Sequence, residues 1–128
     1  MAGATDLAAI LASLDVVRRP EPYTFVFARP ELADRAAATI QETEGPTYIV
    51  TVADAEAAGV PVEFRAAWLT ITVHTALEGV GLTAALSRAL ADAGIACNVL
   101  AGYHHDHLLV PYDRADAAEA VLAALRRA

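Results

Sequence analysis

The sequence has little of what defines several large classes of protein. Cys97 is the only cysteine in the 128 residues, so the chain can form no internal disulfide and no zinc site made of several cysteines. No apolar run approaches the roughly 20 residues of a membrane-spanning helix. The chain also does not open with a basic segment followed by an apolar run. We therefore expect a soluble, cytoplasmic protein with no membrane partner.

Positive charge is scarce as well. Nine Lys and Arg residues stand against sixteen Asp and Glu, for a formal net charge of −7. An acidic chain without a basic stripe repels phosphate groups, so we expect neither a nucleic acid nor an anionic membrane surface as a partner. Hydrophobic residues make up 56% of the chain, which is enough for one compact unit or two small interlocked ones.

The first half of the chain has mixed signals. A first helix capped by Thr5 is predicted by apolar residues at helical spacing, namely Leu7, Ile10, Leu11 and Leu14. Aromatic and β-branched residues predict strands at 23–28 and 47–52. The alanine-rich segment 28–45 favours a helix in spite of Pro30, and 53–59 favours a short helix ended by a glycine.

The second half has clearer periodicity. It predicts a strand within 64–75, with Leu69 and Ile71 on one face and Trp68 and Thr70 on the other. An amphipathic helix at 82–93 follows, then strands at 95–103 and 107–112 and a last helix capped by Asp113. This β-α-β-β-α order over 64–128 predicts an α+β, ferredoxin-like sheet with both helices on one face. The first half would form a degenerate copy or extend the sheet, which divides the chain into residues 1–60 and 61–128.

Residues 74–111 are the most specific part of the sequence. They contain a glycine turn at 80–83, the strand Gly94-Ile95-Ala96-Cys97-Asn98-Val99, and the hairpin Gly-Tyr-His-His-Asp-His at 102–107 before Val110-Pro111. With these motifs the chain resembles the ACT-domain family, in particular a small stand-alone subgroup, and 42–50 is similar to the same subgroup. The resemblance implies an ACT fold, a non-catalytic regulatory role, no cofactor, a small ligand that is usually an amino acid, and a homodimer.

The resemblance also implies where the ligand binds. The family's ligand loop corresponds here to Glu78, Gly79, Val80, Gly81 and Leu82. Glycine lets a backbone approach a ligand closely, and the start of a helix presents unpaired N–H groups that suit a carboxylate. Asn98 on the adjacent strand and His104 or His105 on the hairpin are further candidate ligand contacts. The alternative is that the glycines only make a tight connection and that Asn98 bonds neighbouring backbone.

The histidine-rich hairpin allows a second hypothesis. His105 and His107 share one side of a strand, and His74 could join them as a third metal ligand, completed by Glu78 or Asp106. The ligand spacing is irregular, so a structural or interfacial hairpin that supports oligomerisation is the favoured interpretation. The sequence gives no reason to assign a catalytic residue. The position of Cys97 in its strand indicates a core thiol rather than a nucleophile.

Overall fold

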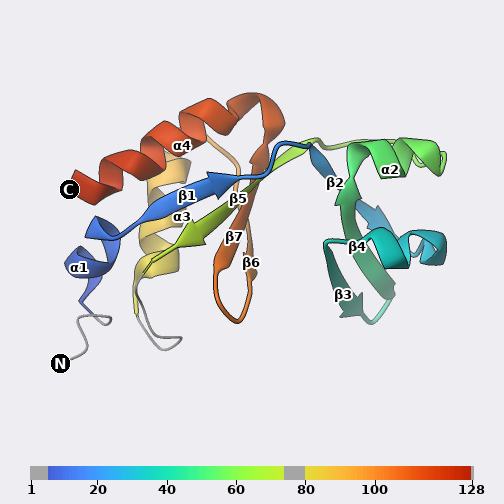
Figure 1. The fold of residues 1–128 in the computed structure, drawn as a ribbon, viewed down its shortest axis with the longest axis horizontal. Helices are drawn as coiled ribbons and strands as arrows, with labels where there is room; N and C mark the ends of the chain where they lie inside the picture. Colours follow the sequence, from blue (N-terminus) through green and yellow to red (C-terminus); the bar gives the residue numbers. More distant parts are fainter. Residues whose placement is uncertain (1–5, 74–79, 128) are drawn as a thin grey trace. The chain divides into compact units, whose positions relative to one another are not determined.

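A computed structural model describes residues 6–73 and 80–127 of the chain (Figure 1). The chain divides into two compact units, each of which is described by itself. Met1–Arg19 and Ala67–Ala128 form the discontinuous unit, and Pro20–Ala66 form the inserted unit. The division of the sequence at residue 60 stays a prediction. In the structure, residues 6–19 pack with the second half of the chain.

The discontinuous unit contains the predicted β-α-β-β-α series. These elements are β5 (Ala66–Thr72), α3 (Leu82–Asp92), β6 (Asn98–Ala101), β7 (Asp106–Pro111) and α4 (Ala115–Ala124). The strand order is β1-β5-β7-β6, where β1 (Asp15–Arg18) comes from the N-terminal segment and pairs antiparallel with β5. The ferredoxin-like prediction is confirmed, and β1 supplies an additional strand beside β5.

One face of this sheet carries the helices and the core. Alternation along the strands directs Leu69 and Ile71 of β5, and Leu108 and Val110 of β7, into a cluster with Leu86 and Leu90 of α3 and Leu122 of α4. Ile10 from α1 (Leu7–Ala12) joins the same core. Trp68 and Thr70 therefore lie on the opposite face, as the alternation in the sequence predicted.

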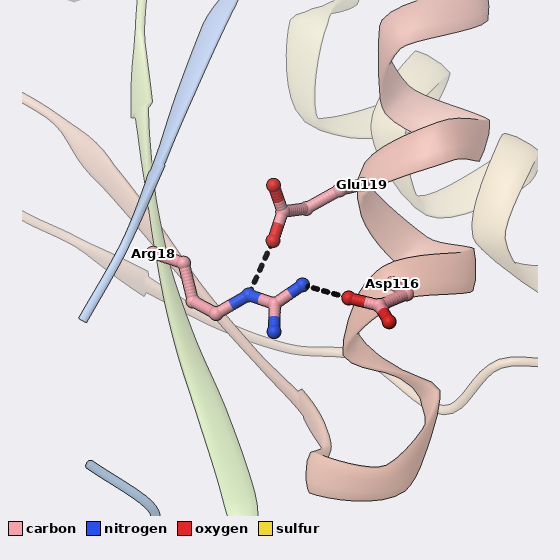
Figure 2. A network of polar contacts seen from close by, with 3 residues as sticks. All are labelled: Arg18, Asp116 and Glu119. Carbon is pink, nitrogen blue, oxygen red and sulfur yellow. Dashed lines mark hydrogen bonds and ion pairs between the residues drawn. The ribbon is translucent and has the colours of Figure 1, made fainter. Parts of the chain in front are cut away.

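Arg18 ties the N-terminal strand to the last helix. From β1 its Nη2 donates to Asp116 Oδ1 at 2.6 Å, and its Nε donates to the Glu119 carboxylate, so one guanidinium spans a turn of α4 (Figure 2). These two hydrogen bonds, that to Asp116 first, raise the pKa of Arg18. The contact fixes the terminal strand against a helix that lies about a hundred residues further along the sequence.

The inserted unit is a smaller sheet with one covered face. Its strands are β2 (Tyr23–Phe27), β3 (Ala38–Glu42) and β4 (Gly45–Thr51), in the order β3-β4-β2 and all antiparallel. A 3₁₀ helix (Pro30–Arg35) and α2 (Val52–Ala57) cover the face of Val26, Tyr48 and Val50. Tyr23, the first residue of β2, pairs with Ala66 on the other edge of the strand.

Two local predictions were wrong. Segment 28–45 is no helix: it holds the short 3₁₀ helix after Pro30 and then β3, because Thr39 and Ile40 are β-branched and pair with β4. Asp113 does not cap α4, since a 3₁₀ turn at Tyr112–Arg114 leads into the helix and the residue at its N-cap is Arg114. The predicted cap Thr5 lies outside the described residues, and Asp6 caps α1 by accepting from Ala8 N–H at 3.1 Å.

Candidate functional site

The start of α3 is the described part of the predicted ligand loop. Gly81 occupies the N-cap position with φ 100°, in the left-handed region that favours glycine, and no side chain within residues 6–73 and 80–127 caps the helix. A Cβ at Gly81 would meet only the Leu7 side chain, at 3.4 Å. Val80 is 83% exposed, whereas the Leu82 side chain is in the core and leaves only its backbone for a ligand. Glu78 and Gly79 lie outside the described residues.

The hairpin tip lies at the same end of the sheet as the start of α3. Chain order requires this: α3 runs back along the sheet from the end of β5, and β6 then returns to the tip (Figure 1). The tip is held by Gly102 N–H, which donates to His105 O at 2.9 Å. His104 and His105 are exposed, with ring centroids 6.3 Å apart, and can contact a solute at this end.

Asn98 does not belong to that group of residues. It opens β6 a few residues after the end of α3, where it pairs with Leu109. The 11 residues of α3, at about 1.5 Å each, separate the level of Asn98 from the start of the helix. The structure brings His104 and His105 to the end of the unit that carries Val80–Leu82, and Asn98 to the other.

His107 is part of a polar cluster on the face opposite the helices. The Trp68 Nε1–H lies 3.2 Å from both His107 Nδ1 and Thr70 Oγ1, and the last two atoms are 3.0 Å apart. The Arg19 guanidinium lies 4.2 Å from the centre of the Trp68 ring. Burial, then the charges of Arg19 and His105, lowers the pKa of His107, and Asp106 acts in the opposite direction. The imidazole is therefore held in its neutral form.

The metal hypothesis gains no geometric support. Within residues 6–73 and 80–127, no three His, Cys, Asp or Glu side chains are grouped so that they could hold a metal ion. His107 Nδ1 is also occupied by Trp68 and Thr70, and His74 is not among the residues that the structure describes. Cys97 is half-buried beside the core, and burial raises the pKa of its thiol, which disfavours the nucleophilic thiolate.

Sequence reasoning missed a cleft in the inserted unit. The cleft has a volume of about 380 Å³ and is lined by residues 24–27 of β2, by Arg29, and by Val60, Pro61, Glu63 and Phe64. We call it the β2 cleft. Part of its wall is aromatic: Phe25, Phe27 and Phe64 line it, and Phe25 stacks on Phe64 with ring centroids 6.3 Å apart. The exposed phenyl groups of β2 were a signal in the sequence, because the strand alternation that buries Val26 leaves Phe25 and Phe27 outward.

The comparisons agree with this architecture. The β-α-β-β-α order with helices on one face is the ferredoxin-like class, and models of the ACT domain match residues 2–67 and 63–124. The chain belongs to the ACT-domain family. ACT domains are typically regulatory domains that bind small molecules. No curated protein matches the sequence.

Three solved structures share the fold. A protein of unknown function from Vibrio cholerae, described as a possible transport protein, is 34% identical over 97% of this chain and 98% of its own, with a TM-score of 0.86. A protein from Agrobacterium tumefaciens is 21% identical over 88% and 89%, with a TM-score of 0.65. The ligand-free regulatory subunit of aspartate kinase from Thermus thermophilus is 13% identical over 88% and 98%, with a TM-score of 0.60. At these last two identities the likeness concerns the fold alone.

Within residues 6–73 and 80–127, every helix is too short or too polar to span a lipid bilayer.

Proposed function

We propose that this protein is a non-catalytic, cytoplasmic sensor that binds an amino acid at the start of α3. The observation that carries the proposal is the helix start itself: Gly81 leads into 11 helical residues, and no side chain among the described residues caps them. Within this part of the chain the first N–H groups of α3 can receive a ligand carboxylate, and the positive end of the helix dipole favours its charge.

The surroundings of the helix start support an amphipathic ligand. Leu7 of α1 supplies an apolar contact at Gly81, and Val80 is exposed beside it. His104 and His105 stand at the same end of the sheet, where an imidazole can accept from an ammonium group or donate to a carboxylate. Asn98 is left out of the proposed site because it lies at the other end of α3.

We infer a regulatory role from membership of the ACT-domain family and not from any assigned reaction centre. A sensor of this kind acts by a difference in ligand affinity between two states of itself or of a partner protein. We expect a homodimer, as in many ACT proteins, and sedimentation of the protein with and without ligand would show whether binding and dimerisation are coupled. Unfolding that is independent of protein concentration would contradict an obligate dimer.

The test is a thermal-shift screen of the free amino acids, followed by ¹H–¹⁵N spectra with any that stabilise the protein. At a hundredfold excess over its Kd a ligand should stabilise the fold by about 2.7 kcal/mol. We expect the amides of Leu82, Thr83 and Ala84 to shift on binding. Stabilisation without any change at these amides would place the ligand elsewhere, and no stabilisation by any amino acid would reject the proposed ligand class.

A charge variant tests the helix start directly. Thr83 is exposed in the first turn of α3, so Thr83→Asp places a carboxylate where the ligand's own carboxylate would bind. An acidic residue there also favours the helix dipole, so the fold should keep its stability while binding is lost. Thr83→Asn is the matched control, of nearly the same shape without the charge, and should still bind. Equal binding by both variants would show that the helix start does not hold the carboxylate.

A further inference from the structure

The free edge of β2 has unsatisfied backbone groups. Val52 N–H donates to Pro22 O at 2.9 Å and Ala28 N–H donates to Pro46 O at 2.8 Å, which fixes the even-numbered residues of β2 as those bonded to β4. In an antiparallel ladder the intervening residues direct their N–H and C=O groups away from that neighbour. Phe25 and Phe27 therefore point their backbone groups at the other edge.

The ladder at that edge stops after one residue pair. Tyr23 pairs with Ala66, but the chain from Val60 to Arg65 forms no strand. Within the described chain, no hydrogen bond joins the outward backbone groups of Phe25 or Phe27 to another backbone group. The β2 cleft opens at this place, between the strand edge and the 60–64 segment. An edge with unpaired groups is a template for another extended chain.

We propose that the β2 cleft binds an extended peptide segment, which adds to β2 as an antiparallel strand. Two donor–acceptor pairs, on Phe25 and Phe27, are about 7 Å apart, which is the repeat of an extended peptide's own groups along one side. This proposal goes beyond amino-acid sensing at α3 and does not depend on it.

The walls of the cleft define the peptide's chemistry. Phe25, Phe27 and Phe64 present aromatic surface, and Phe27 is 53% exposed, so apolar side chains at alternate positions of the peptide would bury it. The cleft also has one cation and one anion. Arg29 is held by Glu31 at 2.9 Å and by Ala58 O at 3.0 Å, and the carboxylate of Glu63 is exposed. A peptide with one negative and one positive side chain would place these charges opposite Arg29 and Glu63.

A single peptide fits the cleft better than a second copy of the protein. The edge of β2 does not face open solvent along its length, because the 60–64 segment forms the opposite wall of the cleft. A whole sheet edge from another copy would bring its own 60–64 segment into that space. One isolated strand has no such obstacle.

The experiment uses a defined probe: a five-residue peptide with valine at alternate positions and one lysine and one glutamate between them, acetylated and amidated at its ends, added to ¹⁵N-labelled full-length protein. The amides of Phe25 and Phe27 should shift and become protected from hydrogen exchange, whereas those of Leu82–Ala84 should not. The same peptide N-methylated on the amides of one side cannot donate to β2 and should bind about tenfold more weakly, the effect of losing about 1.4 kcal/mol of hydrogen bonding.

Two protein variants complete the test. Phe27→Pro removes the outward N–H while leaving the β4 side intact, as edge strands allow, and Phe27→Leu removes the ring but keeps that N–H. Binding should be weaker in the proline variant than in the leucine variant, with far-UV circular dichroism as the check on folding. The N-methylated peptide needs no altered protein, so a misfolded variant leaves that result standing.

Three outcomes would overturn the proposal. They are no shift at Phe25 and Phe27, equal binding of the N-methylated peptide, and displacement of the peptide by free amino acids, which would make the cleft a small-molecule site. Because amino-acid binding at α3 is read at Leu82–Ala84, failure of either proposal is seen separately from failure of the other.

Discussion

The indole N–H of Trp68 on β5 points at Nδ1 of His107 on β7, 3.2 Å away, with the two ring centroids 5.3 Å apart. An indole nitrogen can only donate, so in this hydrogen bond His107 Nδ1 accepts and the proton of the neutral ring lies on Nε2. A proton on Nδ1 would end this hydrogen bond and turn Nδ1 into a donor, with Thr70 Oγ1 as the acceptor 3.0 Å away. The contact therefore couples the charge state of His107 to the packing of β5 against β7.

This coupling predicts a loss of stability in mild acid. The pKa of His107 in the folded state is lowered, chiefly by burial and by Arg19, while in the unfolded chain it is about 6.5. As the pH falls from the unfolded pKa to the folded pKa, the unfolded state takes up the proton first, so the free energy of unfolding decreases. The slope of this decrease with pH corresponds to at most one proton, and the decrease ends below the folded pKa. Urea unfolding measured from pH 7.5 to pH 4.5 would show the decrease.

His107→Gln provides the comparison. Glutamine keeps a polar group near Trp68 and does not titrate in this range. The native protein should therefore lose stability relative to the His107→Gln variant as the pH falls from 7.5 to 4.5. NMR of the imidazole in the native protein should give a midpoint below that of a free histidine. A difference that is constant over the whole pH range would contradict the coupling.

Gly102 is required by close approach rather than by a left-handed backbone. A Cβ on this residue would lie 2.8 Å from His105 O and 3.1 Å from His107 Nε2. Gly102→Ala must therefore move the backbone of the hairpin tip, and we expect a loss of about 1–3 kcal/mol in the free energy of unfolding. The displaced His107 ring should also titrate differently.

Gly94→Ala is the contrasting variant. Gly94 has φ 72° and open space where a Cβ would be. The alanine variant should therefore lose about 1 kcal/mol in the free energy of unfolding, from backbone strain alone. It should leave the titration of His107 unchanged. Equal effects of both variants on that titration would show that Gly102 does not position the ring.

The sequence predicted most of the discontinuous unit because its periodicity is local. The amphipathic pattern of 82–93 and the alternation within 64–75 predicted α3 and the two faces of β5, and Leu86, Leu90, Leu69 and Ile71 are buried. By contrast, β1 has only four residues, and its partner β5 lies some fifty positions away in the chain. Pairing over such a distance leaves no local pattern in the sequence.

The candidate site was predicted only in part. Chain order places the hairpin tip and the start of α3 at one end of the sheet, and it places Asn98, at the start of β6, at the other end, so Asn98 should not have been grouped with them. The β2 cleft arises where a ladder stops, between Tyr23–Ala66 and the unpaired 60–65 segment. Where a ladder stops depends on the tertiary structure, so no local pattern in the sequence predicts it. The aromatic residues of β2 indicated a core just as well as they indicated an open edge.

Leu86 should be among the most sensitive core positions. Its side chain is 1% exposed and faces Leu69 and Leu122 in the central cluster. Leu86→Ala leaves a cavity that the sheet and two helices cannot fill, so we expect a loss of about 2–5 kcal/mol. Arg88→Ala on the exposed side of the same helix should change stability by less than about 0.5 kcal/mol. Denaturant unfolding of both variants measures the contrast, and similar values would contradict the packing described for α3.

Arg18 makes a different kind of contribution, because its two partners differ in exposure. The side chain of Asp116 is 98% exposed, whereas those of Arg18 and Glu119 are 33% and 34% exposed. Water screens an exposed pair strongly, so Glu119 should be the more important partner in Figure 2. Arg18→Met keeps an unbranched aliphatic side chain without the charge and should cost no more than about 1 kcal/mol. In double-mutant cycles with Glu119→Gln and Asp116→Asn, the Glu119 coupling should exceed the Asp116 coupling and weaken in high salt. A larger coupling to Asp116 would show that the exposed carboxylate, rather than that of Glu119, holds the guanidinium.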